Sequence, residues 1–378
     1  MKLTFSISLA LVALAVVNAS PVSVKRAENA PQLTIPLKRN VGAPRTTFDK
    51  NIDELLEGEA LDSIALQDQF DQFSVTVAIG TPPKEFELIV DTASQDTWVI
   101  APECASDACK NRTVYNPDDS TSVEKEYRPF SLTFGDGGIA SGDVYTDTVT
   151  VSAATVDRQS FGSATSLKTP TFDLKGDGIL GLPASDRRNP SFFDNAFEAG
   201  SVSEYIFSLY MPRKGEGELL LGGYNTTRFT GNLTYLPIAF TMLWQVTIDD
   251  MAYRNRSLGI SLKTTVETAT SLIRLDRKSI NTLYAAIPGA KRLSPTRWTI
   301  PCDKVADFTL SMGGVAFKIP GSSITQGPLT EGSKFCLSAI AGGAKTGYAS
   351  LGLAFLENYY TVFDKANTPP RIGFATIA

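Results

Sequence analysis

A short motif that occurs twice limits what this 378-residue chain can fold into more than any other feature. At Asp91-Thr-Ala-Ser an acid ends an apolar run, and at Glu267-Thr-Ala-Thr an acid again precedes apolar residues, 176 positions later. A single acid-Thr-Ala turn after a strand is most often a capping or turn residue. Two matching acid turns indicate instead a duplicated half, each half contributing one carboxylate to a shared site.

The composition excludes several kinds of chemistry. The chain contains no histidine, which excludes Ser-His-Asp and Cys-His catalysis and zinc hydrolase sites built on imidazole. A formal charge of −5, without a basic stripe interleaved with aromatic residues, argues against a nucleic-acid partner. Gly342-Gly-Ala-Lys-Thr-Gly347 has a lysine but lacks the Walker spacing. We therefore expect no cofactor and no metal, and chemistry that depends on carboxylates, hydroxyls, lysines or tyrosines.

The first residues are typical of a secretory signal peptide. In residues 1–19, Lys2 precedes an apolar run that ends at a small-residue cleavage signal, Val17-Asn-Ala19. The run is too short to cross a bilayer, and no later segment approaches the roughly 18 apolar residues that a membrane span needs. We expect a secreted, extracellular protein with no membrane span, and retention in a vacuole or cell wall is the alternative.

The segment after the signal peptide differs in charge from the rest of the chain. Residues 20–48 have a net charge of +4, whereas residues 49–378 have a net charge of −10. The two parts should attract at neutral pH and separate as carboxylates become protonated, which predicts a pro-segment. Two dibasic pairs are candidate processing sites, although such pairs also occur by chance: Lys25-Arg26 and Lys38-Arg39.

From Phe70 onward, short apolar runs alternate with Gly, Pro, Asn and Asp, which predicts a largely β protein. The predicted strands are Phe73–Ile79, Phe86–Val90, Ser131–Phe134, Val144–Val151, Glu218–Leu221, Leu233–Ile238 and Trp244–Ile248. Few helices are expected: Pro190–Ala199, Arg277–Ile287 and a short amphipathic helix at Asn51–Ala65.

Four cysteines in a secreted chain should form disulfides. Pairing of Cys104 with Cys109 and of Cys302 with Cys336 is one of three arrangements that stay open. Neither pair has the Cys-x-x-Cys spacing of redox sites. Four Asn-x-Ser/Thr sequences are candidate N-glycosylation sites: Asn111, Asn225, Asn232 and Asn255.

From Phe70 to Ala378 the sequence resembles the pepsin-like aspartic proteases. The segments that carry the resemblance are Ala78–Pro83, Ile89–Trp98, Thr133–Gly137, Asp177–Leu182, Ser191–Asn195, Leu221–Tyr224, Phe229–Leu233 and Tyr359–Asn367, together with the Glu267 turn. The resemblance implies a bilobal all-β fold with a central cleft and a few short helices, and it places both local cysteine pairs where the family has two of its bridges.

The domain boundaries follow from this resemblance. A signal peptide (residues 1–19) and a pro-segment (residues 20–65), which covers the cleft until acidification, would precede two similar β lobes, residues 66–238 and residues 239–378. We expect a monomer.

The resemblance also implies an activity. A member of this family hydrolyses peptide bonds of peptides or unfolded proteins at acid pH, between bulky apolar residues. Asp91 and Glu267 would share one proton and hold a water, one carboxylate acting as general base while the other donates to the scissile carbonyl. Thr92 and Thr268 would lock the two acid turns together.

Further residues would support this pair. Ser94 would support Asp91, and Trp98 would pack beneath a β-hairpin flap. The flap residues are Phe134, Gly135, Asp136 and Gly137.

The chain departs from the family pattern at five positions. Glu267 replaces an aspartate, Ala93 and Ala269 replace glycines, Phe134 replaces the flap tyrosine, and Leu353 replaces an aspartate. Glutamate extends its carboxylate by one C–C bond, about 1.5 Å, whereas catalytic groups tolerate displacements of only about 0.5 Å. Two functions therefore stay open: an acid endopeptidase of normal or impaired activity, or an inactive relative that binds peptide or protein in its cleft. Carbohydrate binding is a distant third.

Overall fold

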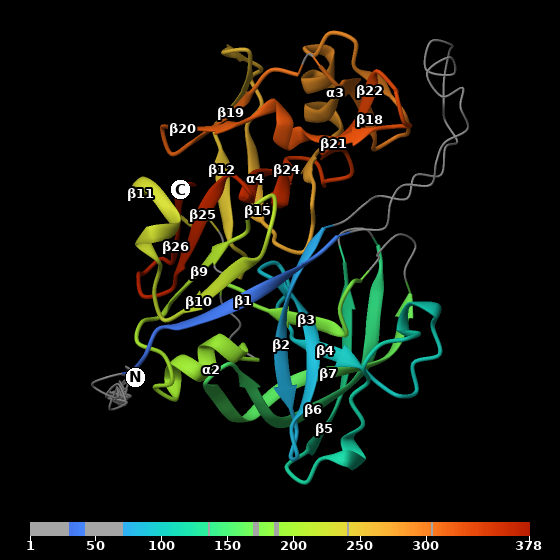
Figure 1. Ribbon diagram of the computed structural model, residues 1–378, viewed down its shortest axis with the longest axis vertical. Coiled ribbons are helices and arrows are strands. Elements are labelled where there is room, and N and C mark those ends of the chain that lie inside the picture. Colours follow the sequence, from blue (N-terminus) through green and yellow to red (C-terminus); the bar gives the residue numbers. More distant parts are fainter. Residues whose placement is uncertain are drawn as a thin grey trace, which may run out of the picture.

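The computed structural model describes residues 30–41, 71–134, 137–168, 174–184, 189–239, 242–303 and 305–378. These residues form a mostly β, bilobal structure, which confirms the predicted fold class (Figure 1). The described part contains three short α-helices: α2 (Phe192–Glu198), α3 (Arg277–Ala285) and α4 (Leu353–Leu356). The first two were predicted within a few residues, whereas α4 was not predicted. The expected helix at Asn51–Ala65 lies outside the described residues.

One large sheet runs through the first half of the chain and also contains the last two strands. In spatial order its strands are β11 (Phe229–Pro237), β26 (Arg371–Ile377), β25 (Tyr359–Asp364), β9 (Ile206–Tyr210), β10 (Gly217–Leu221), β1 (Leu33–Asn40), β2 (Gln72–Ile79), β3 (Lys84–Asp91), β8 (Gly178–Gly181), β4 (Trp98–Ile100), β7 (Ala154–Lys168), β6 (Ile139–Val151) and β5 (Glu124–Thr133). After forming the smaller sheets of its second half, the chain therefore returns to the large sheet with β25 and β26.

The second half forms three smaller sheets. The first contains β12 (Gln245–Ile248), β15 (Leu262–Val266), β24 (Tyr348–Leu351), β16 (Ile273–Leu275) and β23 (Ile340–Ala341). The second contains β14 (Arg256–Ser257), β13 (Asp250–Tyr253), β19 (Phe308–Met312) and β20 (Val315–Ile319). The third contains β17 (Lys291–Arg292), β18 (Trp298–Pro301), β22 (Phe335–Ser338) and β21 (Thr325–Pro328).

The two acid turns follow strands with the same pairing pattern. β3, which ends at Asp91, runs parallel to β8, and β8 pairs antiparallel with β4. β15, which ends just before Glu267, runs parallel to β24, and β24 pairs antiparallel with β16. Because each acid stands at the end of the first strand of such a triplet, the duplication predicted from the sequence is also present in the topology.

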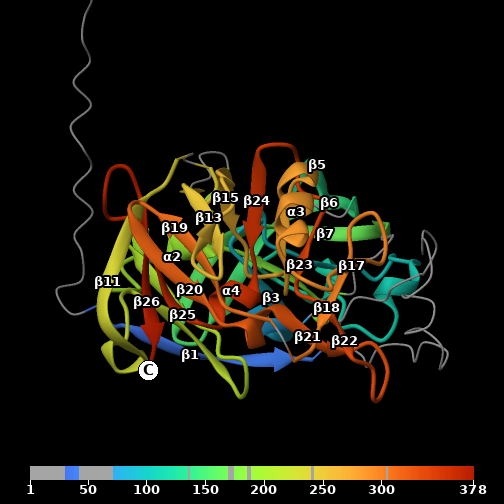
Figure 2. The same ribbon diagram turned by 90° about the horizontal axis from the view of Figure 1, so that it is seen from above.

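Strand β1 lies within the predicted pro-segment but is part of the large sheet. It pairs antiparallel with β10 over Leu33–Leu37 and with β2 over Lys38–Asn40. Leu33, Ile35 and Leu37 are buried in the core, whereas the residues between them are exposed. Figure 2 shows β1 along the side of the molecule opposite to β5, β6 and β24. This strand therefore stabilises the sheet.

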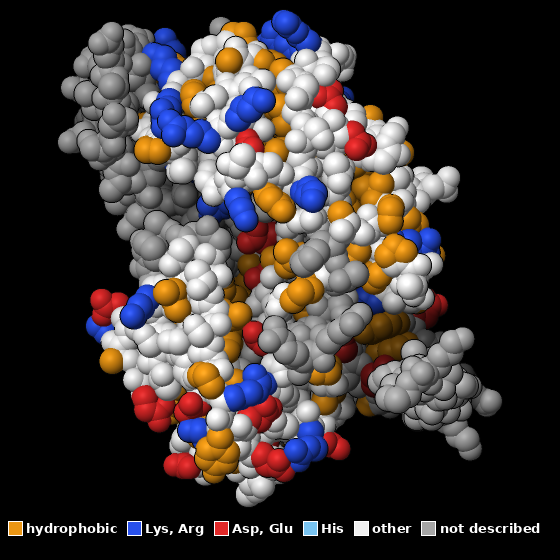
Figure 3. Space-filling model, turned by 180° about the vertical axis from the view of Figure 1, so that it is seen from behind, with side chains coloured by type: hydrophobic (Ala, Val, Ile, Leu, Met, Phe, Trp, Pro, Cys, Tyr) orange, Lys and Arg blue, Asp and Glu red, His pale blue; other side chains and the backbone are white. Residues whose placement is uncertain are grey.

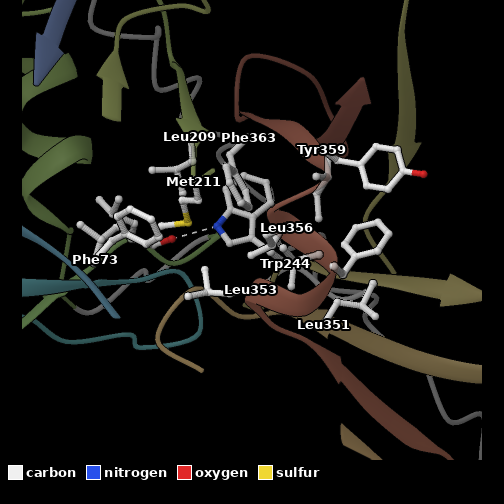
Figure 4. Packing of buried hydrophobic residues seen from close by; sticks show 14 of the residues in the cluster. Phe73, Leu209, Met211, Trp244, Leu351, Leu353, Leu356, Tyr359 and Phe363 are labelled. Carbon is white, nitrogen blue, oxygen red and sulfur yellow. Dashed lines mark hydrogen bonds between the residues drawn. The ribbon is translucent and has the colours of Figure 1, made fainter. Parts of the chain in front are cut away.

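An aromatic cluster joins the two halves of the chain. Phe207 of β9 stacks on Phe363 of β25 with ring centroids 4.6 Å apart, and Trp244 meets Phe363 edge-on at 4.9 Å. The indole Nε1 of Trp244 donates to the carbonyl of Leu182, a buried hydrogen bond of 2.9 Å (Figure 4). Burial of such rings is the main favourable term in a core of this kind.

The two disulfides are Cys104–Cys109 and Cys302–Cys336, so the local pairing is confirmed. Of the helices in the described part, none is both long enough and apolar enough to cross a membrane.

Candidate active site

The structure brings the two predicted catalytic acids into one cleft. Asp91 is the last residue of β3, and Glu267 directly follows β15. Both line a cavity of about 520 Å³ and a neighbouring cavity of about 230 Å³. Ala93 and Phe134 line both cavities as well. Figure 3 shows the face with β5, β6 and β24, which is hollowed near its middle and has acidic side chains in the hollow.

The surroundings of Asp91 favour its protonated form. Its side chain is only 5% exposed. Burial is the largest cause and the charge of Glu267 the second, and together they raise the pKa of Asp91 from 3.8 to about 7. The backbone N–H of Ala93, which donates to Oδ1 at 2.8 Å, and that of Ser94 act in the opposite direction. Only a nearby Glu267 carboxylate could act in this way, so the two acids interact electrostatically.

Thr92 and Thr268 connect the two acid turns through buried hydrogen bonds. The Thr92 hydroxyl donates to the carbonyl of Val266 at 2.8 Å, and the Thr268 hydroxyl donates to the carbonyl of Val90 at 2.7 Å. The backbone N–H of Thr92 also donates to Thr268 Oγ1 at 3.1 Å. Each hydroxyl therefore donates to the buried backbone carbonyl of the residue just before the acid of the other half. These hydrogen bonds fix the distance between the two acid turns.

Ser94 lies beside Asp91, but its hydroxyl donates to the carbonyl of Asp96 at 2.9 Å. Its backbone N–H, not its side chain, interacts with the Asp91 carboxylate. The Ser94 side chain therefore stabilises the backbone of the turn after Asp91.

The predicted flap is the hairpin that joins β5 to β6. The backbone N–H of Phe134 donates to the carbonyl of Gly138 at 2.8 Å, and that of Gly137 donates to the carbonyl of Phe134 at 2.9 Å. Gly135 and Asp136 lie outside the described residues. The ring of Phe134 lies against buried Trp98, with centroids 6.3 Å apart. Within the described ranges, the indole Nε1 of Trp98 has no hydrogen-bond partner.

The three remaining departures are accommodated without backbone strain. Ala93 and Ala269 are not among the described residues with positive φ, so neither position requires a glycine conformation. Leu353 begins α4 with its side chain buried, and its N–H donates to the carbonyl of Thr270 at 2.9 Å. Figure 4 shows Leu353 among the buried apolar residues of the core, near Trp244 and Leu356.

Sequence reasoning missed several residues of the cleft. Gln72 donates from Nε2 to the carbonyl of Ala269 at 3.4 Å and accepts from the N–H of Lys175 at 2.9 Å, so it connects the second acid turn to the first half. Arg274 and Ser350 line the larger cavity. No local pattern marks these residues, because their roles depend on contacts between distant segments.

Three of the candidate glycosylation sites lie outside the helices and strands, at Asn111, Asn225 and Asn255, whereas Asn232 lies within β11. Asn111, Asn232 and Asn255 are exposed. Asn225 is half-buried, and its Oδ1 accepts from the N–H of Thr227 at 3.0 Å and from its hydroxyl at 2.7 Å. In the part of the chain that the structure describes, no group of three or more Cys, Asp or Glu side chains could hold a metal ion.

Comparisons with known proteins agree with this geometry. The family model for eukaryotic aspartyl protease matches residues 72–377. Pepsin II-1 of Oryctolagus cuniculus is 32% identical over 352 residues, covering 89% of this chain and 86% of that protein. Endothiapepsin of Cryphonectria parasitica is 32% identical over 318 residues, covering 81% of this chain and 75% of that protein. Embryonic pepsinogen of Gallus gallus is 30% identical over 311 residues, covering 79% of both chains. Because the match extends from β2 to β26, the last strand of the fold, the chain belongs to the eukaryotic aspartyl protease family.

Proposed function

We propose that this protein is an acid endopeptidase in which Asp91 and Glu267 hold and activate one water molecule. The observation that carries the proposal is the raised pKa of Asp91, which burial and the charge of Glu267 produce. Two carboxyls that cannot both ionise share one proton over the acid range. In the proposed mechanism Asp91, whose burial favours the protonated form, holds that proton, and Glu267 acts as the base.

This arrangement provides both groups that peptide hydrolysis needs. The water oxygen attacks the scissile carbonyl carbon while Glu267 takes the proton of the water and Asp91 gives its proton to the carbonyl oxygen. The C–N bond of the tetrahedral intermediate then breaks as Glu267 returns the proton to the leaving nitrogen, and Asp91 recovers its proton from the hydroxyl. No group outside the carboxylate pair is required for proton transfer.

The surroundings support the same function. The Thr92 and Thr268 hydrogen bonds hold the turns in register, and the flap hairpin borders the cleft. The substrate would be a peptide or an unfolded protein bound in extended form. We propose a secreted, glycosylated, monomeric protein made as a zymogen, with the pro-segment at residues 20–65 and lobes at residues 66–238 and 239–378.

One observation favours a second candidate, an inactive relative that binds peptide or protein in the cleft. Trp98 Nε1 has no partner in the described ranges, and the ring beside it is Phe134, which offers no hydroxyl. The longer Glu267 side chain would also crowd the water. A pair displaced by about 1 Å can lose on the order of 10²-fold in rate.

Acid treatment of the purified precursor separates the two candidates. The endopeptidase trims its own pro-segment and then cleaves unfolded protein at acid pH, below the pKa of about 7 of Asp91, and pepstatin and the Asp91→Asn variant both abolish cleavage. An inactive relative shows neither cleavage. In that case the triple variant Glu267→Asp, Ala93→Gly, Ala269→Gly gains peptidase activity. If the wild type already cleaves peptides as fast as this triple variant, the second candidate is excluded.

A further inference from the structure

We infer that the cleft contains a subsite for an acidic side chain of the bound peptide, formed by Arg274, Ser350 and Lys345. The inference builds on the proposed function, because it names a feature of the peptide that the same cleft selects. All three residues line the 520 Å³ cavity that also contains Asp91 and Glu267.

The strand registers place the subsite on one row of the sheet. Ser350 of β24 is paired with Arg274 of β16 on one side and with Thr265 of β15 on the other. Directly paired residues project from the same face of a sheet, and Thr265, Ser350 and Arg274 all line the cavity. We call Thr265, Ser350, Arg274 and Lys345 together the C-terminal wall of the cleft.

Ser350 is a buried polar group that lacks a partner. Ser350 is 9% exposed, its Oγ is buried, and no described residue forms a hydrogen bond with that atom. A buried hydroxyl without a hydrogen bond destabilises the protein, so a polar ligand group at this position is favoured. A carboxylate can accept from this hydroxyl.

Arg274 supplies the charge. Its Nη1 lies 3.9 Å from the position that a Cβ would occupy at Gly343, so the guanidinium lies beside the loop at the cavity rim. Arg274 is half-buried, and its side chain makes no ion pair or hydrogen bond with the described residues. A planar guanidinium matches a carboxylate through two parallel hydrogen bonds, which makes arginine the preferred residue for such recognition.

The loop that carries Lys345 is held in place. The N–H of Ala344 donates to the carbonyl of Leu275 at 3.2 Å, and the N–H of Gly347 donates to Asp276 Oδ2 at 2.8 Å. The ammonium of Lys345 lies 5.7 Å from the centroid of the Tyr348 ring. The loop therefore presents a second cation at the same rim without prior reorganisation.

The charges of the cavity are separated along the cleft. Its described acidic residues are Asp91 and Glu267, and its basic residues are Arg274 and Lys345. Thr265 precedes Glu267 by two residues, which is about 7 Å along a strand at about 3.3 Å per residue. An acidic side chain on the C-terminal wall would therefore be one or two residues from the scissile bond of an extended peptide, away from the carboxylate pair.

Paired peptides test the subsite independently of catalysis. The peptides are apolar and contain a hydroxyethylene group in place of the scissile bond, with Glu or Gln at each of the two positions on either side. Binding to the secreted chain, before and after acid treatment, is measured by calorimetry at pH 5.5 and pH 3. At one position Glu should bind about tenfold more tightly than Gln at pH 5.5, as expected for a charged hydrogen bond. At pH 3 the ratio should approach one, because glutamate has a reference pKa of about 4.3.

Substitutions test whether the C-terminal wall causes the preference for Glu over Gln peptides. Arg274→Met should abolish the difference between Glu and Gln, and Lys345→Gln should reduce it about two- to threefold, as for an exposed charge. Arg277→Met is the matched control, because Arg277 is exposed on α3 and does not line the cavity. Its preference should be unchanged.

Three results would overturn the inference: equal binding of Glu and Gln peptides at every position, a preference that persists in Arg274→Met, or no binding of any peptide. Cleavage of the corresponding amide peptides is followed separately. Preferential binding of Glu peptides without cleavage would contradict the proposed catalysis but support the subsite. Cleavage without a preference for Glu over Gln would support the catalysis but contradict the subsite.

Discussion

Lys365 donates a hydrogen bond to Asp194, and both side chains are buried. Lys365 follows β25 near the end of the chain, whereas Asp194 belongs to α2 in the first half, so the pair joins segments 171 residues apart. The ammonium also donates to the carbonyl of Pro183 at 3.2 Å, and the hydroxyl of Tyr205 donates to Asp194 at 2.7 Å. Burial lowers the pKa of Lys365, and the charge of Asp194 partly offsets this effect.

This pair predicts a large stability loss when one partner is removed. Lys365→Met should lower the free energy of unfolding by about 3–5 kcal/mol, because Asp194 would be left as a buried charge without its cation. The measurement is denaturant unfolding at pH 6. Lys318→Met is the control, since Lys318 forms an exposed ion pair with Asp307 and should change stability by about 0–1 kcal/mol. Equal losses in the two variants would contradict this assignment.

The raised pKa of Asp91 predicts that stability falls as pH rises. The native protein keeps a proton on Asp91 up to about pH 7, whereas the unfolded chain loses it near 3.8. Stabilisation is therefore complete below 3.8 and is lost between that pH and about 7, by roughly 4 kcal/mol in total. Asp91→Asn removes this dependence.

The test is the difference in unfolding free energy between Asp91→Asn and the wild type across pH 3 to 8. The difference should grow in favour of the variant as pH rises, because the titrating groups outside the Asp91–Glu267 pair contribute equally to both proteins. A difference that does not change with pH would show that Asp91 is not protonated in the native state.

The hydroxyl of Thr268 predicts a combined loss of stability and activity. Thr268→Val leaves the N–H of Thr92 and the carbonyl of Val90 without their partner, at a cost of about 1–3 kcal/mol for each buried group. The rate of peptide cleavage should also fall, on the order of 10²-fold if the turns shift by about 1 Å. Thr247→Val, at an exposed position of β12, should change neither quantity.

Much of the site could be predicted because its signals are local. The acid turns, the Thr residues beside them and the flap each occupy a few consecutive residues, and the resemblance assigned them roles. The row formed by Thr265, Ser350 and Arg274 could not be predicted, since it depends on the register between three strands that are distant in sequence. Strand pairing of this kind is set by tertiary packing and not by local propensity.

Strand β1 shows a different reason for a missed element. The alternation of buried and exposed residues in Leu33-Thr-Ile-Pro-Leu37 has the period of a strand, and it was available in the sequence. The positive charge of residues 20–48 predicts a detachable pro-segment, and charge alone does not indicate that one face of the segment packs into a sheet. Its partner β10 follows about 180 residues later, so only the structure shows what the face packs against.

The pairing of β1 predicts that the dibasic pair Lys38-Arg39 resists cleavage in the folded chain. Lys38 and Arg39 pair with Ser74 and Phe73 of β2, and the guanidinium of Arg39 bonds to Asp71 and to a backbone carbonyl. A protease must bind this segment in extended, unpaired form. At neutral pH, mass spectrometry should therefore detect little cleavage after Arg39 by a dibasic-specific protease.

Loosening the strand should remove this protection. Leu37→Ala deletes a fully buried side chain, which costs about 2–5 kcal/mol, and should speed cleavage after Arg39 by at least tenfold. Thr34→Ala changes an exposed residue of the same strand and should leave cleavage slow. Rapid cleavage of the wild type at the rate of Leu37→Ala would show that β1 opens freely, in which case Lys38-Arg39 is an accessible processing site before any acidification.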